Sequence, residues 1–406
     1  MDTNPLFTLA LGLASPWRVS ETIFDADQRR LDLRLAYADS AHFPCPSCGV
    51  ADCPVYDADE KQWRHLDFFQ HQAFLTARVP RIQCRACGVR QVTVPWARPG
   101  SGFTLLMEVL VLELARNMPM RAIARLLNVD DKRWWRVVEH YVDQAVERMD
   151  CSAVRRIGVD ETSARRRHDY ISLFYDLDQR RMVFATTGKD AGTVDAFIDF
   201  LDDHQGSADT VREVSCDMSP AFIKGVRDHL PNAAVTFDRF HVMHVLSDAV
   251  DVVRRSVWRS DRTVKGCRYL LLTNPENLSA EQEERLSEVI NRNAALAEVY
   301  RLKQTFRDLY QQPTYAAGRG FLKAWITMAQ RSGLEPMKKA AETIRAHWQG
   351  ILHWFVSRIS NGIMEALNSL VQAAKRKARG YRNHRTFILM AYLIAGKLDL
   401  VKTHTK

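Results

Sequence analysis

Three acidic residues of this chain, Asp160, Asp217 and Glu365, occur in settings that suit metal chemistry. Asp160 and Asp217 each come at the end of an apolar strand segment, where the side chains of open sheets line sites. Three converging carboxylates can hold two Mg²⁺ ions, because hard cations prefer oxygen ligands and because adjacent carboxylates repel one another without a cation. Two such ions suit displacement at a phosphodiester, with water or a 3′-hydroxyl attacking. The alternative for each Asp is an ordinary turn or cap residue.

Glu365 belongs to a stretch, from Ser360 to Asn383, that predicts an amphipathic helix capped by Ser360 or Asn361. The expected buried stripe recurs at helical spacing and consists of Ile363, Leu367, Leu370 and Ala374. The expected polar face carries Asn368 and Gln372 and leads into the basic residues Lys375, Arg376, Lys377, Arg379, Arg382 and Arg385. One acid followed by a basic ridge suits a metal-binding carboxylate beside a phosphate backbone. The alternative is a solvated, charged helix face.

Four cysteines form two CxxCG pairs, Cys45 with Cys48 and Cys84 with Cys87. The glycine of each pair permits the tight turn that brings backbone amides to a thiolate. Four thiolates from two such turns predict a tetrahedral structural Zn²⁺ site, with redox pairs as the competing interpretation. The nearby alternative ligands are Cys53, His65 and His71. The residues Cys151, Cys216 and Cys267 follow no pattern and are interpreted as apolar thiols.

The composition favours a protein that binds a polyanion. The net charge is +9 and the pI is about 9.2, which point toward nucleic acid. We expect no membrane span, because no run of apolar residues is long enough, and no signal peptide, because the N-terminus lacks a basic region. The expected location is therefore the cytoplasm.

Residues 103–148 are predicted to be helical and contain a helix-turn-helix pattern. A short helix with Ile123, Leu126 and Leu127 on its apolar face precedes the turn 128–130. The second helix carries basic residues at its start, namely Lys132, Arg133 and Arg136, which suit contacts with DNA. Trp134 and Trp135 follow, and we expect at least one to pack in a core.

From about residue 153 the pattern becomes three strands, then helix, strand, helix, strand, helix, which predicts an α/β layer. Residues 258–350 are polar and helical without strand signals. Because of this block, Asp217 and Glu365 lie 148 residues apart in the sequence, which is too long for a simple connection within one small sheet domain. The block therefore predicts an all-helical insertion in the α/β domain.

The sequence resembles a bacterial insertion-sequence transposase of the DDE type, and specifically the ISL-three family. The motifs that carry the resemblance are the double CxxCG ribbon, the helix-turn-helix, IGVDETS, VSCDMSPAF, FDRFHV and SNGIMEALNSLVQAAKRKARGYRN. The resemblance implies a ribonuclease-H-like core, interrupted by an all-α insertion, in which Asp160, Asp217 and Glu365 bind Mg²⁺ or Mn²⁺. Asp238 and His241 of FDRFHV match a further family motif, and the alternative is a capping Asp with a packed His.

The expected fold is therefore a multidomain α+β chain in five parts. These are a zinc ribbon (1–100), a helix-turn-helix region (101–150), the first part of the catalytic core (151–257), the insertion (258–350) and the Glu helix with the C-terminal helices (351–406). The resemblance implies binding of double-stranded DNA at terminal inverted repeats and target sites, by a homodimer or higher oligomer. The alternatives are a DNA-binding regulator with an inactive core and another ribonuclease-H-like nuclease. Strand alternation places Glu161 on the face opposite Asp160, so it is left out of the site.

Overall fold

The computed structural model describes residues 3–165 and 169–400, and the chain divides into two compact units. The N-terminal unit extends to Val138 and the C-terminal unit runs from Glu139 to Leu400. The boundary falls inside helix α4 (Asp131–Glu147), so each unit is described by itself.

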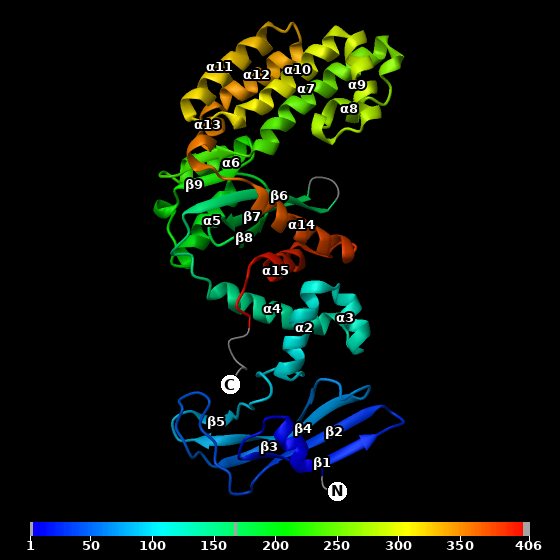
Figure 1. Ribbon diagram of the computed structural model, residues 1–406. Helices are drawn as coiled ribbons and strands as arrows, with labels where there is room; N and C mark the ends of the chain where they lie inside the picture. The colour runs from blue at the N-terminus through cyan, green and yellow to red at the C-terminus, as the bar shows by residue number, and fades with distance from the viewer. Residues whose placement is uncertain (1–2, 166–168, 401–406) are drawn as a thin grey trace. The chain divides into compact units, whose positions relative to one another are not determined.

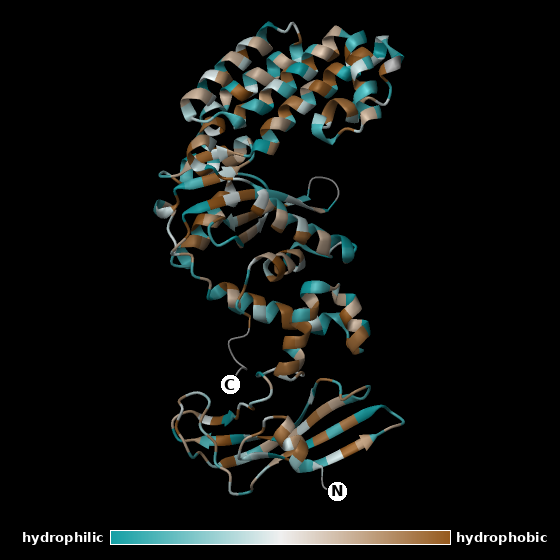
Figure 2. Cartoon of the chain, in the orientation of Figure 1, coloured by the Kyte–Doolittle hydropathy of each residue, from teal (hydrophilic) through white to brown (hydrophobic). Residues whose placement is uncertain are grey.

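The N-terminal unit contains a sheet with the order β1-β2-β4-β3, and β5 pairs with β4. Its elements are helix α1 (Asn4–Ala10) and strands β1 (Trp17–Asp25), β2 (Arg30–Tyr37), β3 (Val55–Arg64), β4 (Gln72–Cys84) and β5 (Gly88–Gln91). Figure 2 shows hydrophobic and hydrophilic residues alternating along β1 and β2, and alternate residues of β2 are buried accordingly.

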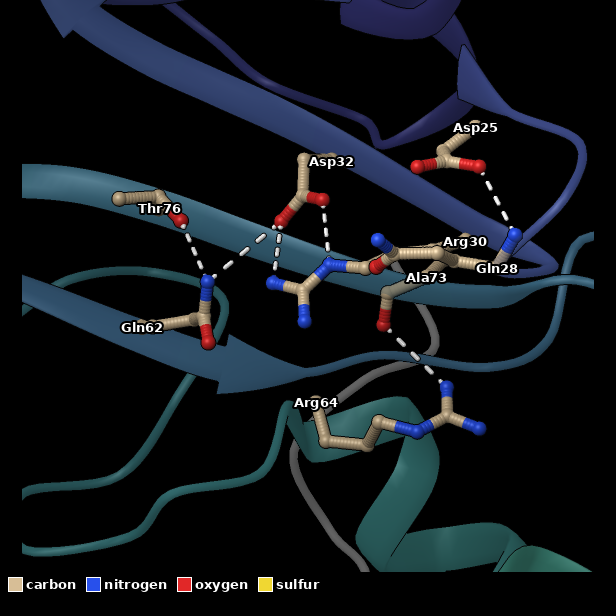
Figure 3. A network of polar contacts seen from close by, with 8 residues as sticks. All are labelled: Asp25, Gln28, Arg30, Asp32, Gln62, Arg64, Ala73 and Thr76. Atoms are coloured by element: carbon tan, nitrogen blue, oxygen red, sulfur yellow. Dashed lines mark hydrogen bonds and ion pairs between the residues drawn. The ribbon is translucent and has the colours of Figure 1, made fainter. Parts of the chain in front are cut away.

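Polar side chains bind one another across this sheet (Figure 3). Gln62 of β3 donates to Thr76 of β4 at 3.1 Å, and Asp32 accepts from Arg30 of the same strand, β2, at 2.5 Å. The buried Arg64 guanidinium donates to the Ala73 carbonyl at 3.2 Å, so this charge is satisfied inside the unit.

Three helices follow: α2 (Leu105–Asn117), α3 (Met120–Leu127) and α4. The turn between α3 and α4 contains Asn128 with a φ of 51°, and the Asp130 carboxylate accepts from the Lys132 amide at 2.9 Å at the start of α4. Ile123 and Leu127 are buried as predicted. The prediction for Leu126 is wrong: it is 62% exposed, and Met120 packs in the core in its place.

The C-terminal unit contains a five-stranded sheet with the order β10-β9-β6-β7-β8 (Figure 1). Its strands are β6 (Arg156–Arg165), β7 (Asp169–Asp176), β8 (Arg181–Thr187), β9 (Glu213–Cys216) and β10 (Ala234–Phe237). Strands β6, β7 and β8 are antiparallel, whereas β9 and β10 continue the sheet in parallel with β6. Helix α5 (Gly192–Asp203) links β8 toward β9, and α6 (Pro220–His229) links β9 to β10.

A helical segment follows β10, and residues 258–350 contain no strand, as predicted. Its α-helices are α7 (Arg239–Ser260), α8 (Arg268–Leu272), α9 (Ala280–Arg292), α10 (Ala294–Arg307), α11 (Tyr315–Arg331), α12 (Glu335–Ala346) and α13 (Trp348–Ser357). Helices α7, α10, α11 and α12 pack side by side in Figure 1. The chain then returns to the sheet: α13 packs on β10, α14 (Gly362–Lys377) on β6 and α15 (His384–Ala395) on β8.

Candidate active site and zinc site

Three aspartates occupy matching positions on three neighbouring parallel strands. Gly158 of β6 pairs with Ser215 of β9, which pairs with Thr236 of β10. Two residues beyond each of these positions lie Asp160, Asp217 and Asp238, which the register therefore brings to one edge of the sheet. Asp217 and Asp238 directly follow their strands. The prediction that Asp160 lies at a strand end is wrong. Strand β6 continues past Asp160 to Arg165, paired with β7; of its two neighbours, only β9 ends near this level.

These side chains line a cavity of about 370 Å³ together with Glu365. The other lining residues are Val159, Phe240, His241, Asn361 and Met364. The structure therefore brings together the three acids singled out in the sequence, although 148 residues separate the last two, and it adds Asp238 as a fourth. The apolar lining residues give the carboxylates a setting that is only partly aqueous.

Helix α14 reaches this cavity because it is tied to the sheet at its start and in its middle. The Ser215 hydroxyl donates to Asn361 Oδ1 at 2.8 Å, which joins the start of the helix to β9. Asn361 is the N-cap residue, as predicted, but its side chain serves this contact and makes no capping hydrogen bond. Met364 is buried over Gly158 of β6.

The predicted buried stripe of α14 is wrong. Leu370 is 54% exposed, and the buried residues of the helix are Met364 and Val371. The helix is rotated so that Asn368 and Gln372, expected on the polar face, contact β6 by hydrogen bonds. The physical reason is that β6 offers polar partners there, so amide groups can be buried with their hydrogen bonds satisfied.

Both oxygens of Asp160 accept hydrogen bonds. The Glu161 amide donates to Oδ1 at 2.8 Å and Asn368 Nδ2 donates to Oδ2 at 2.7 Å. Burial raises the pKa of Asp160, and these two donors oppose the rise because they stabilise the carboxylate. Sequence reasoning did not assign Asn368 to the site; its distance of three residues from Glu365 on one helix was the available signal.

Asp238 and His241 form a hydrogen-bonded pair at the first turn of α7. His241 Nδ1 lies 2.9 Å from Asp238 Oδ2, while the Phe240 amide donates to Oδ1 at 2.9 Å. The hydrogen bond to Asp238 raises the pKa of His241, with smaller contributions from Asp217 and Asp160. Asp238 thus caps the helix, as one alternative held, yet the pair also lines the cavity.

Glu161 does not line the cavity, in agreement with strand alternation. It is nevertheless not remote from the site. Burial raises the pKa of Glu161, and repulsion by the charge of the Asp217 carboxylate raises it further. The expectation that its side chain belongs wholly to the opposite face is therefore too strict.

The cavity fits divalent metal by its donor chemistry, since it combines four carboxylates with one imidazole. Within residues 3–165 and 169–400, the only group that brings at least three His, Cys, Asp or Glu ligand atoms within 4.8 Å of one another is a set of thiols. The acids are spread more widely around their cavity.

That set of thiols is Cys45, Cys48, Cys84 and Cys87, whose sulfur atoms fit a single Zn²⁺ ion. Gly49 and Gly88 have φ values of 74° and 72°, in the left-handed region, which confirms the tight turn expected at each pair. Backbone amides of Cys87 and Ala86 lower the pKa of Cys84 to about 6, and amides of Cys48 and Ser47 lower that of Cys45. Such turns favour the thiolate that a metal requires.

The three alternative ligands are placed elsewhere or remain outside the group. His65 Nδ1 contacts the Thr104 hydroxyl at 2.9 Å, and the ring of His71 packs against Phe24 with centroids 4.5 Å apart. Burial raises the pKa of Cys53, and nearby Cys84, Cys45 and Cys48 raise it further, but the Cys53 Sγ contacts the Val50 carbonyl at 3.6 Å.

Comparison with known families decides the identity of the chain. Residues 157–391, more than half of the chain, match the DDE transposase family of the ISL3 type. The chain belongs to the ISL3 family of DDE transposases. Residues 92–142 match the helix-turn-helix domain of transposase family ISL3, and residues 42–87 match the zinc-finger of transposase IS204/IS1001/IS1096/IS1165.

Two curated relatives match this transposase over most of its length and most of theirs. The chain is 28% identical to the transposase for insertion sequence element IS1557 of Mycobacterium tuberculosis, over 96% of this chain and 94% of the relative. It is 27% identical to the transposase for insertion sequence element IS1001 of Bordetella parapertussis, over 85% and 87%. The protein is thus an enzyme that acts on DNA, with divalent metal in its catalytic site and a structural zinc in its ribbon.

The three basic residues predicted to contact DNA from the helix-turn-helix are exposed, but one of them also packs on an aromatic ring. Lys132, Arg133 and Arg136 are all exposed, but the Arg133 guanidinium lies 4.3 Å from the centroid of the Phe103 ring. Trp134 is fully buried and stacks on Phe103, which confirms that at least one of the two tryptophans packs in a core.

The basic residues after Glu365 are also divided. Exposed side chains are those of Arg376, Lys377, Arg379 and Arg382. Lys375 is different: its ammonium donates to the Ser163 carbonyl, and burial lowers its pKa. Arg385 binds the carboxylates of Glu139 and Asp143 on α4 and so supports the fold of the C-terminal unit.

Among the described residues, no helix is both long and apolar enough to cross a membrane.

Proposed function

We propose that this transposase binds the terminal inverted repeats of its own element and cleaves and joins DNA strands at the cavity lined by Asp160, Asp217 and Glu365. The observation that carries the proposal is the convergence of these acids from β6, from the end of β9 and from α14 on one cavity. A family assignment alone does not require that all three acids be present and line one cavity.

The proposal includes a ribonuclease-H-like core. The support is the strand order β8-β7-β6-β9-β10, with three antiparallel strands followed by two parallel ones. The helices of residues 258–350 act in this proposal as an all-α insertion, since the chain leaves the sheet after β10 and returns with α13 and α14. The proposed domain boundaries lie at residues 100, 150, 257 and 350.

Asp160, Asp217 and Glu365 would hold Mg²⁺ or Mn²⁺, and Cys45, Cys48, Cys84 and Cys87 would hold the zinc. The chemistry that the catalytic ions supply when bound is activation of the attacking oxygen and stabilisation of the leaving oxygen. Asp238 would orient His241 toward the same cavity, since their ring-to-carboxylate contact fixes the imidazole.

DNA would be held by Lys132, Arg133 and Arg136 in the N-terminal unit and by Arg376, Lys377, Arg379 and Arg382 at the end of α14 and just after it. Lys375, also assigned to DNA in the sequence, would contribute mainly by supporting α14 on β6. We further propose that a homodimer or higher oligomer acts on DNA, in the bacterial cytoplasm and at the nucleoid.

The deciding experiment uses a supercoiled donor plasmid that carries the element's ends. Asp160→Ala, Asp217→Ala and Glu365→Ala should each abolish nicking and excision with Mg²⁺ or Mn²⁺, yet bind the ends nearly as the wild type does, because phosphate contacts lie on basic side chains. The matched control Glu161→Gln should cost much less. Wild-type cleavage by the Glu365→Ala protein would refute the site and make Asp238 the next acid to test. End binding without any cleavage by the wild type would favour a DNA-binding regulator.

A further inference from the structure

A chain of four polar side chains joins α14 to β6 and ends on Asp160. Gln372 donates to the Thr162 hydroxyl. Thr162 donates to Asn368 Oδ1 at 2.9 Å, and Asn368 Nδ2 donates to Asp160 Oδ2 at 2.7 Å. Thr162 is buried, and Asn368 and Gln372 are half-buried, so these groups depend on one another for hydrogen bonds.

The direction of this chain is determined at its far end. Gln372 Nε2 also lies 3.4 Å from the Ser163 carbonyl, which can only accept, so the amino group of Gln372 faces β6. Thr162 then accepts from Gln372 and has one proton left, which goes to Asn368 Oδ1. The amino group of Asn368 must consequently face Asp160. Reversal of the Asn368 amide would place two acceptors together at Asp160 and two donors together at Thr162.

The effect at Asp160 is a carboxylate held at both oxygens, because the Glu161 amide occupies Oδ1. Without this restraint, Asp160 would be free to rotate away from the like charges of Asp217, Asp238 and Glu365 in the same cavity. Partners that orient a metal ligand typically change metal affinity 10–100-fold when they are removed.

We propose that Asn368 is a positioning residue that, through Thr162 and Gln372, holds the Asp160 carboxylate in its metal-binding orientation. This inference rests on the proposed function, in which Asp160 binds the catalytic metal. It also assigns a structural role to Asn368 and Gln372, which the sequence pattern placed only on the polar face of the helix. Asn368 and Thr162 would act on the reaction only through Asp160.

The test compares Thr162→Val with Thr162→Ser in the full-length, zinc-loaded protein. The Val side chain has nearly the shape of Thr but lacks the hydroxyl, whereas Ser keeps it. Mn²⁺ binding is measured by electron paramagnetic resonance of the free ion, without DNA. Thr162→Val and Asn368→Ala should weaken Mn²⁺ binding roughly 10-fold or more, while Thr162→Ser and the exposed control Ser369→Ala should bind as the wild type does.

The second measurement is the Mn²⁺ concentration needed for half-maximal plasmid cleavage. It should rise by the same factor in Asn368→Ala, with the maximal rate largely recovered at saturating Mn²⁺ and end binding retained. Wild-type Mn²⁺ affinity in Asn368→Ala and Thr162→Val, together with weakened binding in Asp160→Ala, would overturn the positioning role alone. Unchanged Mn²⁺ binding in Asp160→Ala would overturn the proposed function itself, and the positioning role with it.

Discussion

Gly158 and Met364 are packed so closely that residue 158 can carry no side chain without movement of its neighbour. A Cβ at Gly158 would lie 2.0 Å from Met364 Sδ and 2.9 Å from its Cγ. Met364 is buried and lies one residue before Glu365. This close contact joins β6, which carries Asp160, to α14, which carries Glu365.

Gly158→Ala should displace α14 and lower plasmid cleavage at least about 10-fold, since overpacking of about 1–3 kcal/mol is relieved by shifting the helix that carries Glu365. Gly158→Ala with Met364→Ala should recover part of the loss, because the shorter side chain makes room. Gly320→Ala is the matched control, as its added Cβ meets nothing within 4 Å. Full cleavage activity in the single Gly158 variant would show that the position of α14 is not critical.

Binding of the element's ends should depend on Lys132 and Arg136. Each is exposed at the start of α4, and removal of each phosphate-binding cation should reduce the slope of log affinity against log salt by about 1. Lys338→Ala removes the same charge from α12, where the ammonium pairs with Glu335 at 2.6 Å, and should leave the slope unchanged. Equal slopes for Lys132→Ala, Arg136→Ala and Lys338→Ala in a fluorescence anisotropy titration would assign DNA binding to other residues.

The N-terminal unit should become less stable as pH falls from about 6.5 to about 4. Burial, with a smaller effect of the Arg64 charge, lowers the pKa of His65 to about 4, against an ordinary value near 6.5. In this window the unfolded chain binds a proton that the folded chain excludes, so stability is complete above pH 6.5 and is lost toward pH 4. The loss approaches about 3 kcal/mol at 1.36 kcal/mol per pKa unit.

His65→Gln should flatten this dependence, because the replacement does not titrate. The measurement is urea unfolding followed by tryptophan fluorescence at a series of pH values. Acid loss of zinc affects both proteins, so the difference between them isolates His65. Parallel pH profiles for the two proteins would contradict the assignment.

Purified protein should contain about one structural zinc per chain, bound by the four thiols. Cys84→Ser should lose it and unfold the turns at Gly49 and Gly88, since the remaining thiols cannot complete a tetrahedral site. Cys53→Ser provides the control and should keep its zinc, as Cys53 lies outside the four-thiol group. Metal analysis by mass spectrometry gives the result, and stoichiometric zinc in Cys84→Ser would mean that the ligands are misassigned.

Much of this transposase follows from local sequence. The CxxCG pairs predict turns that depend only on residues a few positions apart, and the structure contains them. The strands and helices between residues 153 and 257 occur in the predicted order, because apolar periodicity acts within each segment. The acids Asp160, Asp217 and Glu365 were also visible as residue types in suitable motifs.

Tertiary structure alone decided which faces met. Leu126 and Leu370 fit apolar stripes by spacing, but both are exposed, because burial depends on what a distant element offers. Asn368 was expected only on a polar helix face, yet it binds Asp160, since β6 presents polar partners across a separation of 208 residues. Asp238 likewise lies beside Asp217 only because β10 pairs with β9 in one particular register. Hydrogen bonds between segments distant in sequence set that register, and the periodicity of a single segment cannot predict it.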